Sequence, residues 1–231
     1  MPPEPRRPHC PVCLRPSSGC ICRWITPVEH RVEVLILQHP LEAAHAKGTA
    51  RLLHLSLPHS RLVQGEVFDE QVLRQLLTAP FSATSPGPGA PPVAPRHAVL
   101  LYPESPTGGH PATATPPPLP DGWRSAPALL RLVVLDGTWR KSRKMLYLNP
   151  LLQQLPRLPL QGMPASRYRI RAAHGPDQLS TLEATCAALA QLEGHPERFA
   201  PLLAAMDGFV GQQQRYLPAM ASEGVAGAAL P

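Results

Sequence analysis

The chain has 231 residues, of which 43% are hydrophobic and 16% are charged. This length and composition allow one hydrophobic core, or a core with a small appendage, and exclude a wholly disordered chain. The net charge of +6 favours a polyanionic partner without requiring one, because a basic enzyme with no such partner has the same balance. No apolar run reaches the ~18 residues that a membrane span needs. No signal peptide is visible either, so we expect a cytoplasmic protein.

Four cysteines lie close together near the N-terminus, in the pattern Cys10-x2-Cys13-x6-Cys20-x-Cys22. Clustered thiols in a reducing compartment are typical of a tetrahedral zinc site, and the metal would order a segment that is too short for its own core. The C-x-C spacing of the second pair departs from a standard zinc ribbon. An iron–sulfur cluster and a metal-free or redox role are therefore alternatives. The sequence predicts a four-cysteine zinc-binding segment over residues 1–27.

Strand and helix patterns alternate through the first half of the chain. Apolar runs predict three strands: 31–38, 61–63 and 98–102. Helical patterns predict two helices: 42–55, although Gly48 interrupts it, and 69–77. Low-complexity composition predicts two exposed segments: 81–96 and 107–120. His39 follows the first strand, where it either caps and packs the turn or takes part in a site.

The chain is organised around the stretch 132–150. Its apolar start predicts a buried strand, which ends at the turn dipeptide Asp136-Gly137. Thr138 is the predicted N-cap of a basic helix that ends at Asn149. A strand that ends in an acid, a glycine turn and a helix N-terminus is how α/β enzymes build sites at the carboxyl ends of their strands.

The last part of the chain predicts a short strand, an extended basic segment and two helices. The strand is expected at 156–160 and the extended segment at 167–171, where alternate arginines share one face. A capping box of Ser180 and Glu183 starts a helix, and another helix is expected at 196–217. We therefore predict an α/β domain over residues 28–217, with a mainly parallel sheet and flanking helices, and a flexible tail at 218–231.

At Asp136-Gly137-Thr138-Trp139 the sequence resembles the DTW-domain family of tRNA-uridine aminocarboxypropyltransferases, whose signature is Asp-x-Thr-Trp on a strand-to-helix turn. Other blocks similar to the family occur in the expected order. They are the cysteine cluster, Gln38-His39-Pro40-x-Glu42, Leu100-Leu101-Tyr102-Pro103, Tyr168-x-x-Arg171 and Ser180-Thr181-Leu182-Glu183-Ala184. Together these blocks span residues 10 to about 190, so the resemblance covers most of the chain.

The resemblance implies a fold and an activity. The family is similar to SPOUT-type enzymes, which implies a trefoil knot in the C-terminal half. The implied reaction moves the 3-amino-3-carboxypropyl group of S-adenosylmethionine to N3 of a tRNA uridine, in the variable loop. A ribosomal-RNA aminocarboxypropyltransferase, an S-adenosylmethionine-dependent RNA methyltransferase and a non-catalytic zinc-containing RNA-binding protein are the alternatives. The sequence does not indicate an oligomeric state.

The resemblance also implies site residues. The catalytic candidates are Asp136, Thr138 and Trp139. Asp136 is either the base for the N3 proton or a residue that binds the cofactor or holds the turn. Thr138 caps the helix or binds ligand, and Trp139 packs on the cofactor or holds the fold. S-adenosylmethionine is expected among three loops, formed by Leu101, Tyr102 and Pro103, by Leu135, Asp136, Gly137 and Thr138, and by Ile170, Arg171, Leu179, Ser180, Thr181 and Glu183. The tRNA backbone is expected on Arg140, Lys141, Lys144, Arg167, Arg169 and Arg171, and Zn2+ on the cysteines.

Overall fold

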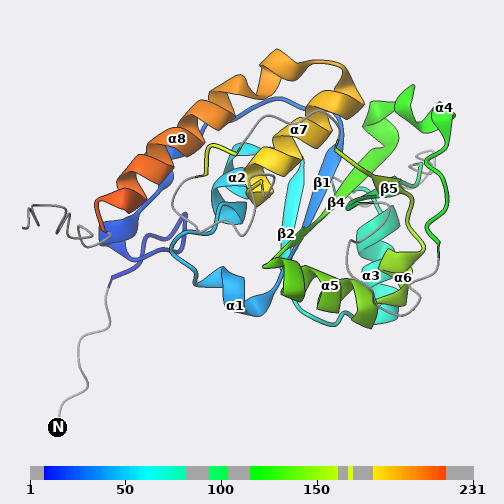
Figure 1. Cartoon of the computed structure of the whole chain (residues 1–231), viewed down its shortest axis with the longest axis horizontal. Helices are drawn as coiled ribbons and strands as arrows, with labels where there is room; N and C mark the ends of the chain where they lie inside the picture. The colour runs from blue at the N-terminus through cyan, green and yellow to red at the C-terminus, as the bar shows by residue number, and fades with distance from the viewer. Residues whose placement is uncertain (1–7, 82–93, 104–114, 161–165, 169–178, 217–231) are drawn as a thin grey trace, which may run out of the picture.

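The computed structural model describes residues 8–81, 94–103, 115–160, 166–168 and 179–216. Five strands form one sheet in the order β2-β1-β4-β3-β5, and every neighbouring pair is parallel. They are β1 (Glu33–Gln38), β2 (Ser60–Gln64), β3 (His97–Leu101), β4 (Leu130–Asp136) and β5 (Arg157–Leu158). Helices lie on both faces of this sheet (Figure 1). The predicted α/β class with a parallel sheet is confirmed.

The helices fall into two layers. The α-helices are α1 (Pro40–Ala43), α2 (Ala50–Ser56), α3 (Glu70–Thr78), α4 (Asp121–Arg124), α5 (Trp139–Leu148), α6 (Pro150–Gln153), α7 (Thr181–Glu193) and α8 (Ala200–Gln214). Four 3-10 helices accompany them: η1 (Ser17–Gly19), η2 (Cys22–Trp24), η3 (Pro127–Leu129) and η4 (Pro196–Phe199). Helices α2, α7 and α8 cover one face of the sheet, and α3, α5 and α6 cover the other (Figure 1). None of the described helices is both long and apolar enough to cross a membrane.

The sheet is buried on both faces, which is why its central strands are continuous apolar runs. Every residue of β1 is buried. Successive side chains point to opposite faces: Val34 and Ile36 join the core under α2, α7 and α8, whereas Leu35 and Leu37 join the core under α3, α5 and α6. β4 lies between β1 and β3 and carries its terminal carboxylate, Asp136, to the carboxyl edge of the sheet.

The prediction of one continuous helix at 42–55 is wrong. The helix expected at 42–55 is two helices, α1 and α2. His39 caps α1, because its Nδ1 accepts a hydrogen bond from the Leu41 N–H at 3.2 Å. The chain then makes successive tight turns, in which the His45 N–H donates to Glu42 and the Gly48 N–H donates to His45. The helix expected at 196–217 begins as the 3-10 helix η4 and ends, as α8, at Gln214.

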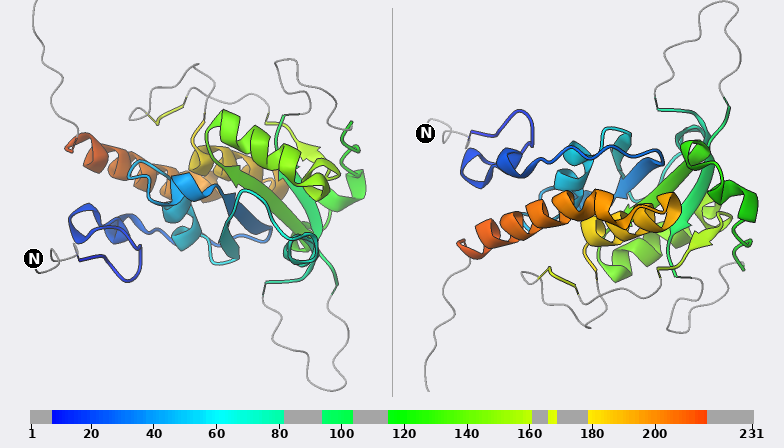
Figure 2. Two further views of the ribbon diagram at one scale, coloured as in Figure 1. Left: turned by 90° about the horizontal axis from the view of Figure 1, so that it is seen from below. Right: turned by 90° about the horizontal axis from the view of Figure 1, so that it is seen from above.

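The cysteine segment docks on α8. In both views of Figure 2 it lies beside the C-terminal half of that helix. The Trp24 indole N–H donates to Oε1 of Gln212 at 2.5 Å, and Nε2 of Gln212 donates to the Cys20 carbonyl at 3.0 Å. Cys13 and Ile21 are buried in the same core as the sheet. The segment therefore shares the core of the α/β domain, and a domain boundary after residue 27 stays a prediction.

Two predicted features fall largely on residues outside the described ranges. The expected tail, 218–231, is one of them. The other is the trefoil knot, which depends on the chain between β5 and α7, where only residues 159–160, 166–168 and 179–180 are described. Both stay predictions.

Replacing Gly208 by alanine is expected to loosen the cysteine segment. A Cβ at Gly208 would lie 2.2 Å from Cζ3 of Trp24, whose ring is held by Gln212. Overpacking of this kind costs ~1–3 kcal/mol, which outweighs the ~1 kcal/mol that alanine gains over glycine in a helix. Gly211→Ala is the matched control on the same helix, because nothing lies within 4 Å of its added Cβ. Urea unfolding should rank Gly211→Ala at or above the parent protein and Gly208→Ala below it; equal stability of the two variants would contradict this packing.

Candidate active site at the carboxyl edge of the sheet

Asp136 is the central polar residue of this edge. The strand register places it opposite Gln38, the last residue of β1. Nε2 of Gln38 donates to Oδ2 of Asp136 at 2.8 Å, and the Thr181 hydroxyl donates to Oδ1 at 2.6 Å. The residue is only 5% exposed. Each carboxylate oxygen has two lone pairs, so each can accept more than one hydrogen bond.

The turn after Asp136 leads directly into α5. Thr138 is its N-cap, as predicted, and its hydroxyl accepts a hydrogen bond from the Lys141 N–H at 3.4 Å. Gly137 allows the turn to approach its neighbours, since an added Cβ would lie 3.1 Å from Cβ of Lys141 and 3.7 Å from Cβ of His39. The N-terminus of α5, with its unpaired N–H groups, therefore lies at the same edge as the Asp136 carboxylate.

An aromatic pair lies on the α5 side of this edge. Trp139, the first residue of α5, stacks on Tyr102 with ring centroids 5.2 Å apart and planes 10° apart. Tyr102 is buried, and burial raises the pKa of its phenol. Trp139 is 41% exposed, so one part of its ring holds the fold and the rest is accessible. The pair fits both roles that the sequence leaves open for Trp139.

Arg157 lies beside the candidate site and was not singled out by the sequence analysis. It begins β5, its side chain is buried, and its Nη1 donates to the Pro103 carbonyl at 2.9 Å. Its guanidinium lies 5.1 Å from the centre of the Tyr102 ring. The only signal in the sequence is a basic residue inside a short apolar segment, 156–160, that was expected to be a strand.

The capping box at the start of α7 is confirmed, and it does more than cap. The Ser180 hydroxyl accepts from the Glu183 N–H, and the Glu183 carboxylate accepts from the Ser180 N–H at 2.8 Å. The same carboxylate accepts from the Ser166 hydroxyl at 2.9 Å and from the Arg167 N–H at 2.7 Å. Glu183 is thus occupied in holding the segment 166–168 against the start of α7.

The loop between α1 and α2 is held from three directions. Thr49 accepts a hydrogen bond from the Leu182 N–H at 3.2 Å. Nη2 of Arg15, in the cysteine segment, donates to the Gly48 carbonyl at 2.7 Å. The Tyr168 hydroxyl donates to the Lys47 carbonyl. This loop therefore connects the cysteine segment, the segment 166–168 and the start of α7.

The remaining predicted cofactor residues fall in two groups. Leu101 ends β3, Leu135 immediately precedes Asp136 in β4, and Leu179 precedes the cap of α7, so these three lie at loop entrances on one edge. Ile170 and Arg171 lie outside the described residues. The structure thus brings together the loops at 101–103, 135–139 and 179–183.

The basic residues predicted to contact RNA are not equally available. Nζ of Lys141 lies 2.8 Å from the buried Glu42 carboxylate, and Nζ of Lys144 lies 3.0 Å from Glu66. Lys144, and after it His39, lower the pKa of the Glu66 carboxyl. Arg140 is exposed, and so is Arg167, which pairs with Asp207 at 3.3 Å. Arg169 and Arg171 lie outside the described residues. Exposed pairs are weak enough to exchange for phosphate.

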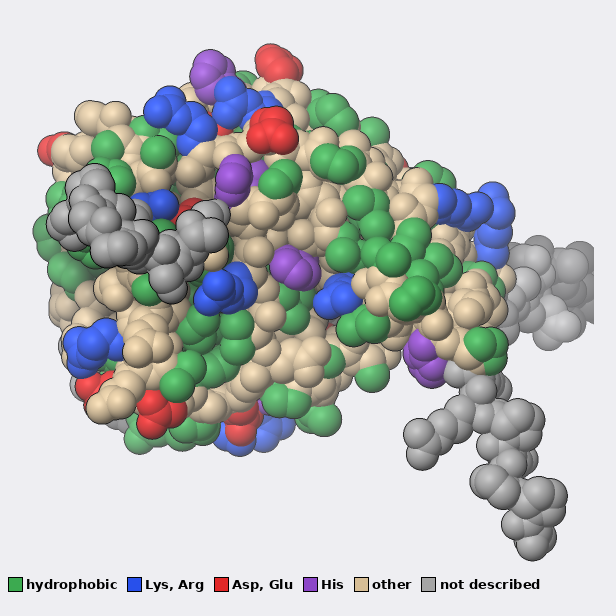
Figure 3. All heavy atoms as spheres, turned by 180° about the vertical axis from the view of Figure 1, so that it is seen from behind, with side chains coloured by type: hydrophobic (Ala, Val, Ile, Leu, Met, Phe, Trp, Pro, Cys, Tyr) green, Lys and Arg blue, Asp and Glu red, His purple; other side chains and the backbone are tan. Residues whose placement is uncertain are grey.

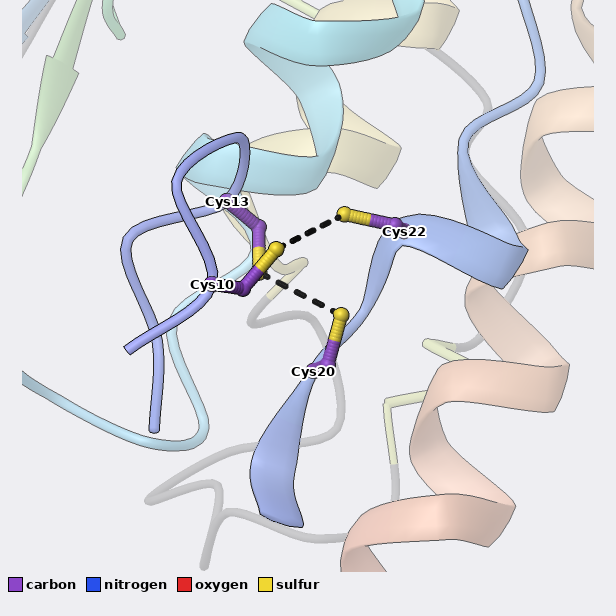
Figure 4. A group of neighbouring side chains, drawn as sticks. All are labelled: Cys10, Cys13, Cys20 and Cys22. Atoms are coloured by element: carbon purple, nitrogen blue, oxygen red, sulfur yellow. Dashed lines mark hydrogen bonds between the residues drawn. The ribbon is translucent and has the colours of Figure 1, made fainter. Parts of the chain in front are cut away.

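The four N-terminal cysteines form a compact group in which all the sulfurs lie within 4.8 Å of one another. Figure 4 shows Cys10 and Cys13 on one loop facing Cys20 and Cys22 on another, with Sγ distances of 3.5 Å for Cys10–Cys22 and 3.8 Å for Cys13–Cys20. Sulfurs ~2.3 Å from one tetrahedral zinc ion would be ~3.8 Å apart. All the cysteines are free thiols, and the donor set can hold one metal ion.

Within this group, the thiol of Cys10 has a lowered pKa. Backbone N–H groups of Cys13 and Val12 point at the Cys10 sulfur and lower the pKa of this thiol to about 6. Burial and the neighbouring thiols raise the pKa of Cys22 to about 12. A metal ion would replace protons throughout the group, because its ligands are thiolates.

The geometry defines the class of protein: an α/β protein with a polar site at the carboxyl ends of parallel strands and a separate four-cysteine group. The chain belongs to the DTW domain family, since the family model described as "DTW domain" matches residues 7–214. The predicted family is therefore confirmed. No solved structure matches the chain.

Curated relatives cover most of the chain. It is 29% identical over 193 residues to tRNA-uridine aminocarboxypropyltransferase 2 of Mus musculus, a match that covers 81% of this chain and 57% of the mouse protein. It is 30% identical over 203 residues to the Drosophila melanogaster protein of the same name, covering 84% of this chain and 70% of the relative. Similarity to tRNA-uridine aminocarboxypropyltransferase A of Arabidopsis thaliana is 27% over 156 residues, 61% of this chain and 50% of the relative. The chain is thus similar to only a part of each relative, little more than half of the mouse protein.

Replacing Thr181 by valine should weaken the junction of α7 with the sheet. The change keeps the shape of the side chain and removes the hydroxyl that donates to Asp136. Loss of a hydrogen-bond donor to a buried carboxylate lowers the free energy of unfolding by ~1–3 kcal/mol, and urea unfolding can measure this difference. Thr185→Val is the control, because within the described residues that hydroxyl donates to the Thr181 carbonyl, one turn earlier in the same helix. Equal losses in the two variants would show that the bond to Asp136 adds nothing.

Proposed function

We propose that this protein is a tRNA-modifying transferase that moves the 3-amino-3-carboxypropyl group of S-adenosylmethionine to N3 of a tRNA uridine, with the variable loop as the expected position. The observation that carries the proposal is the Asp136 carboxylate, held at the carboxyl edge of the sheet by Gln38 and Thr181 in a chain of the DTW domain family. The names of the curated relatives support the same activity. A parallel sheet places ligands at this edge.

The chemistry needs a proton acceptor and no general acid. In the proposed reaction N3 of the uridine loses its proton and forms a bond to the carbon of the arm that is attached to sulfur. The carbon–sulfur bond breaks, its electron pair stays on sulfur, and neutral methylthioadenosine leaves. Asp136 would accept the N3 proton, with its position held by the hydrogen bonds from Gln38 and Thr181. Its alternative role, holding the donor or the Gly137 turn, uses the same position.

The donor site is proposed at the loops that contain Tyr102, Asp136 to Trp139, and Leu179 to Glu183. The accessible part of the Trp139 ring offers a surface for a flat group. A SPOUT-like knot, which would bring the chain after β5 back to this site, belongs to the proposal. The hydrogen bonds that hold residues 166–168 on Glu183 are in keeping with it.

The tRNA is proposed to meet the same edge through exposed arginines. Arg140, which lies beside Trp139 in the first turn of α5, and Arg167 are the best placed of the described candidates. On the face shown in Figure 3 the Lys and Arg side chains are spread out, with neutral and acidic groups between them. The described residues of that face therefore offer no broad basic surface to a phosphate backbone. A cytoplasmic location stays a prediction.

Asp136→Asn tests the reaction and the role of the carboxylate together. Unmodified total tRNA is incubated with S-adenosylmethionine labelled in the carboxypropyl arm, and the nucleosides are identified by mass spectrometry. We expect labelled aminocarboxypropyluridine with the parent protein and a ~10²–10⁴-fold lower rate with Asp136→Asn, the range for loss of a general base. Asp69→Asn is the control, because Asp69 is the N-cap of α3 and asparagine caps equally well. If only ribosomal RNA is labelled, the chemistry stands and the proposed tRNA substrate is wrong. Full activity of Asp136→Asn would show that this carboxylate is not needed in the mechanism.

The four-cysteine group is proposed to hold one structural Zn2+. A closed set of four thiolates stabilises a fold and leaves no open position for chemistry. Elemental analysis of the purified protein should find about one zinc per chain, and a chelator should lower the melting temperature. Cys20→Ser should lose the metal, whereas Cys186→Ala should keep it, because Cys186 is buried in the main core. Iron in the purified protein, or no metal at all, would contradict the proposal.

A further inference from the structure

Two arginines of the sheet are almost completely buried, and their surroundings differ. At the amino edge every nitrogen of the Arg131 guanidinium donates a hydrogen bond: its Nε and Nη2 donate to the Glu33 carboxylate, and its Nη1 and Nη2 donate to the Leu76 and Ala79 carbonyls. Arg157 at the other edge is 4% exposed and makes one hydrogen bond, from Nη1 to the Pro103 carbonyl. No carboxylate of the described residues forms an ion pair with it.

The unused donors of Arg157 are a specific pair. Its Nε and Nη2 are buried and have no hydrogen-bond partner within the described chain. These two N–H groups point to the same side of a guanidinium and form the fork that matches a carboxylate. Arg131 uses this same pair of nitrogens on Glu33. A buried cation without a counter-ion is unfavourable, so Arg157 is arranged for an anion that the described chain does not supply.

The fork lies beside the proposed donor site. The Arg157 guanidinium lies 5.1 Å from the ring centre of Tyr102, and Tyr102 stacks on Trp139 in the turn that follows Asp136. The Tyr102 hydroxyl is also buried without a hydrogen-bond partner in the described chain. Trp139 is the exposed member of this group, and the Arg157 side chain is its most buried charged member.

We propose that the Nε and Nη2 groups of Arg157 bind the α-carboxylate of the aminocarboxypropyl arm of the donor. This inference rests on the proposed function and adds the residue that recognises the transferred group. A carboxylate held at the far end of the arm fixes the position of the carbon that is attacked, so the same contact helps to select the arm over the methyl group. The depth of the fork favours a small carboxylate on a flexible arm over a phosphate of a bulky RNA backbone.

The experiment compares two donors that differ only in the carboxylate, S-adenosylmethionine and its decarboxylated form. Their affinities are measured by calorimetry for the parent protein, Arg157→Gln and Arg157→Lys. We expect Arg157→Gln to weaken S-adenosylmethionine binding ~10–100-fold, the range for a hydrogen-bonded charge pair, and to change the decarboxylated form by less than about threefold. Arg157→Lys should fall between, because it keeps the charge and loses the fork.

Arg96→Gln is the control variant. Arg96 lies near the amino end of β3, where its Nε is 3.1 Å from the Glu33 carboxylate, so its loss should leave the ratio of the two donor affinities unchanged. Melting temperatures of all variants establish that they are folded.

The outcomes separate the inference from the proposed function. Equal loss of both donors in a folded Arg157→Gln protein would make Arg157 structural, and loss of RNA affinity alone would make it a phosphate ligand. Either result overturns the inference, as would a parent protein that modifies tRNA and binds both donors equally. A parent protein that binds neither donor removes the proposed function, and this inference with it.

Discussion

The position of the Asp136 carboxylate is the constraint on which the candidate site depends. Gln38 fixes it from the neighbouring strand β1, and Thr181 fixes it from α7, which is distant in the sequence. The start of α7 in turn carries Glu183, which holds residues 166–168, and receives Thr49 from the loop between α1 and α2. Hydrogen bonds therefore link the Asp136 carboxylate, directly or through the start of α7, to three segments: the start of α7, residues 166–168 and the loop between α1 and α2. A group that is held by its neighbours in this way cannot reorient freely, which favours a fixed geometry towards a substrate.

The two edges of the sheet treat buried charge in opposite ways. At the amino edge Glu33 and Arg131 neutralise each other, and every nitrogen of the Arg131 guanidinium donates a hydrogen bond, so this ion pair serves stability. At the carboxyl edge Lys144 pairs with Glu66 near the surface, and the Nε and Nη2 groups of Arg157 have no hydrogen-bond partner within the described chain. A parallel sheet gathers functional groups at its carboxyl edge. Here the same edge also carries Arg157, a buried cation that has no ion pair with a carboxylate of the described residues.

Local patterns were sufficient for most of the fold. The apolar run of β4, the cap at Thr138 and the capping box of Ser180 with Glu183 are each encoded within a few residues, and each is confirmed. The sequence indicated an interruption at Gly48 within one helix at 42–55, but not two separate helices, because the loop between α1 and α2 is stabilised by distant groups, Arg15 and Tyr168. Pairing of Lys141 with Glu42 is equally invisible to local patterns, since 99 residues separate the two. Arg157 has no motif at all, and only burial reveals it. The knot and the arginines at 169 and 171 stay predictions.

The placement of the tryptophans has a practical consequence. The chain has three, and each lies in a different part of the molecule. Trp24 is hydrogen-bonded beside the cysteine group, Trp123 is stacked on His97 with ring centroids 4.5 Å apart, and Trp139 covers Tyr102 at the carboxyl edge. Indole emission depends on its immediate surroundings, so variants that keep one tryptophan at a time would have spectrally distinct reporters. The protein thus contains its own optical probes for its four-cysteine group, its sheet and its candidate active site, without an added dye.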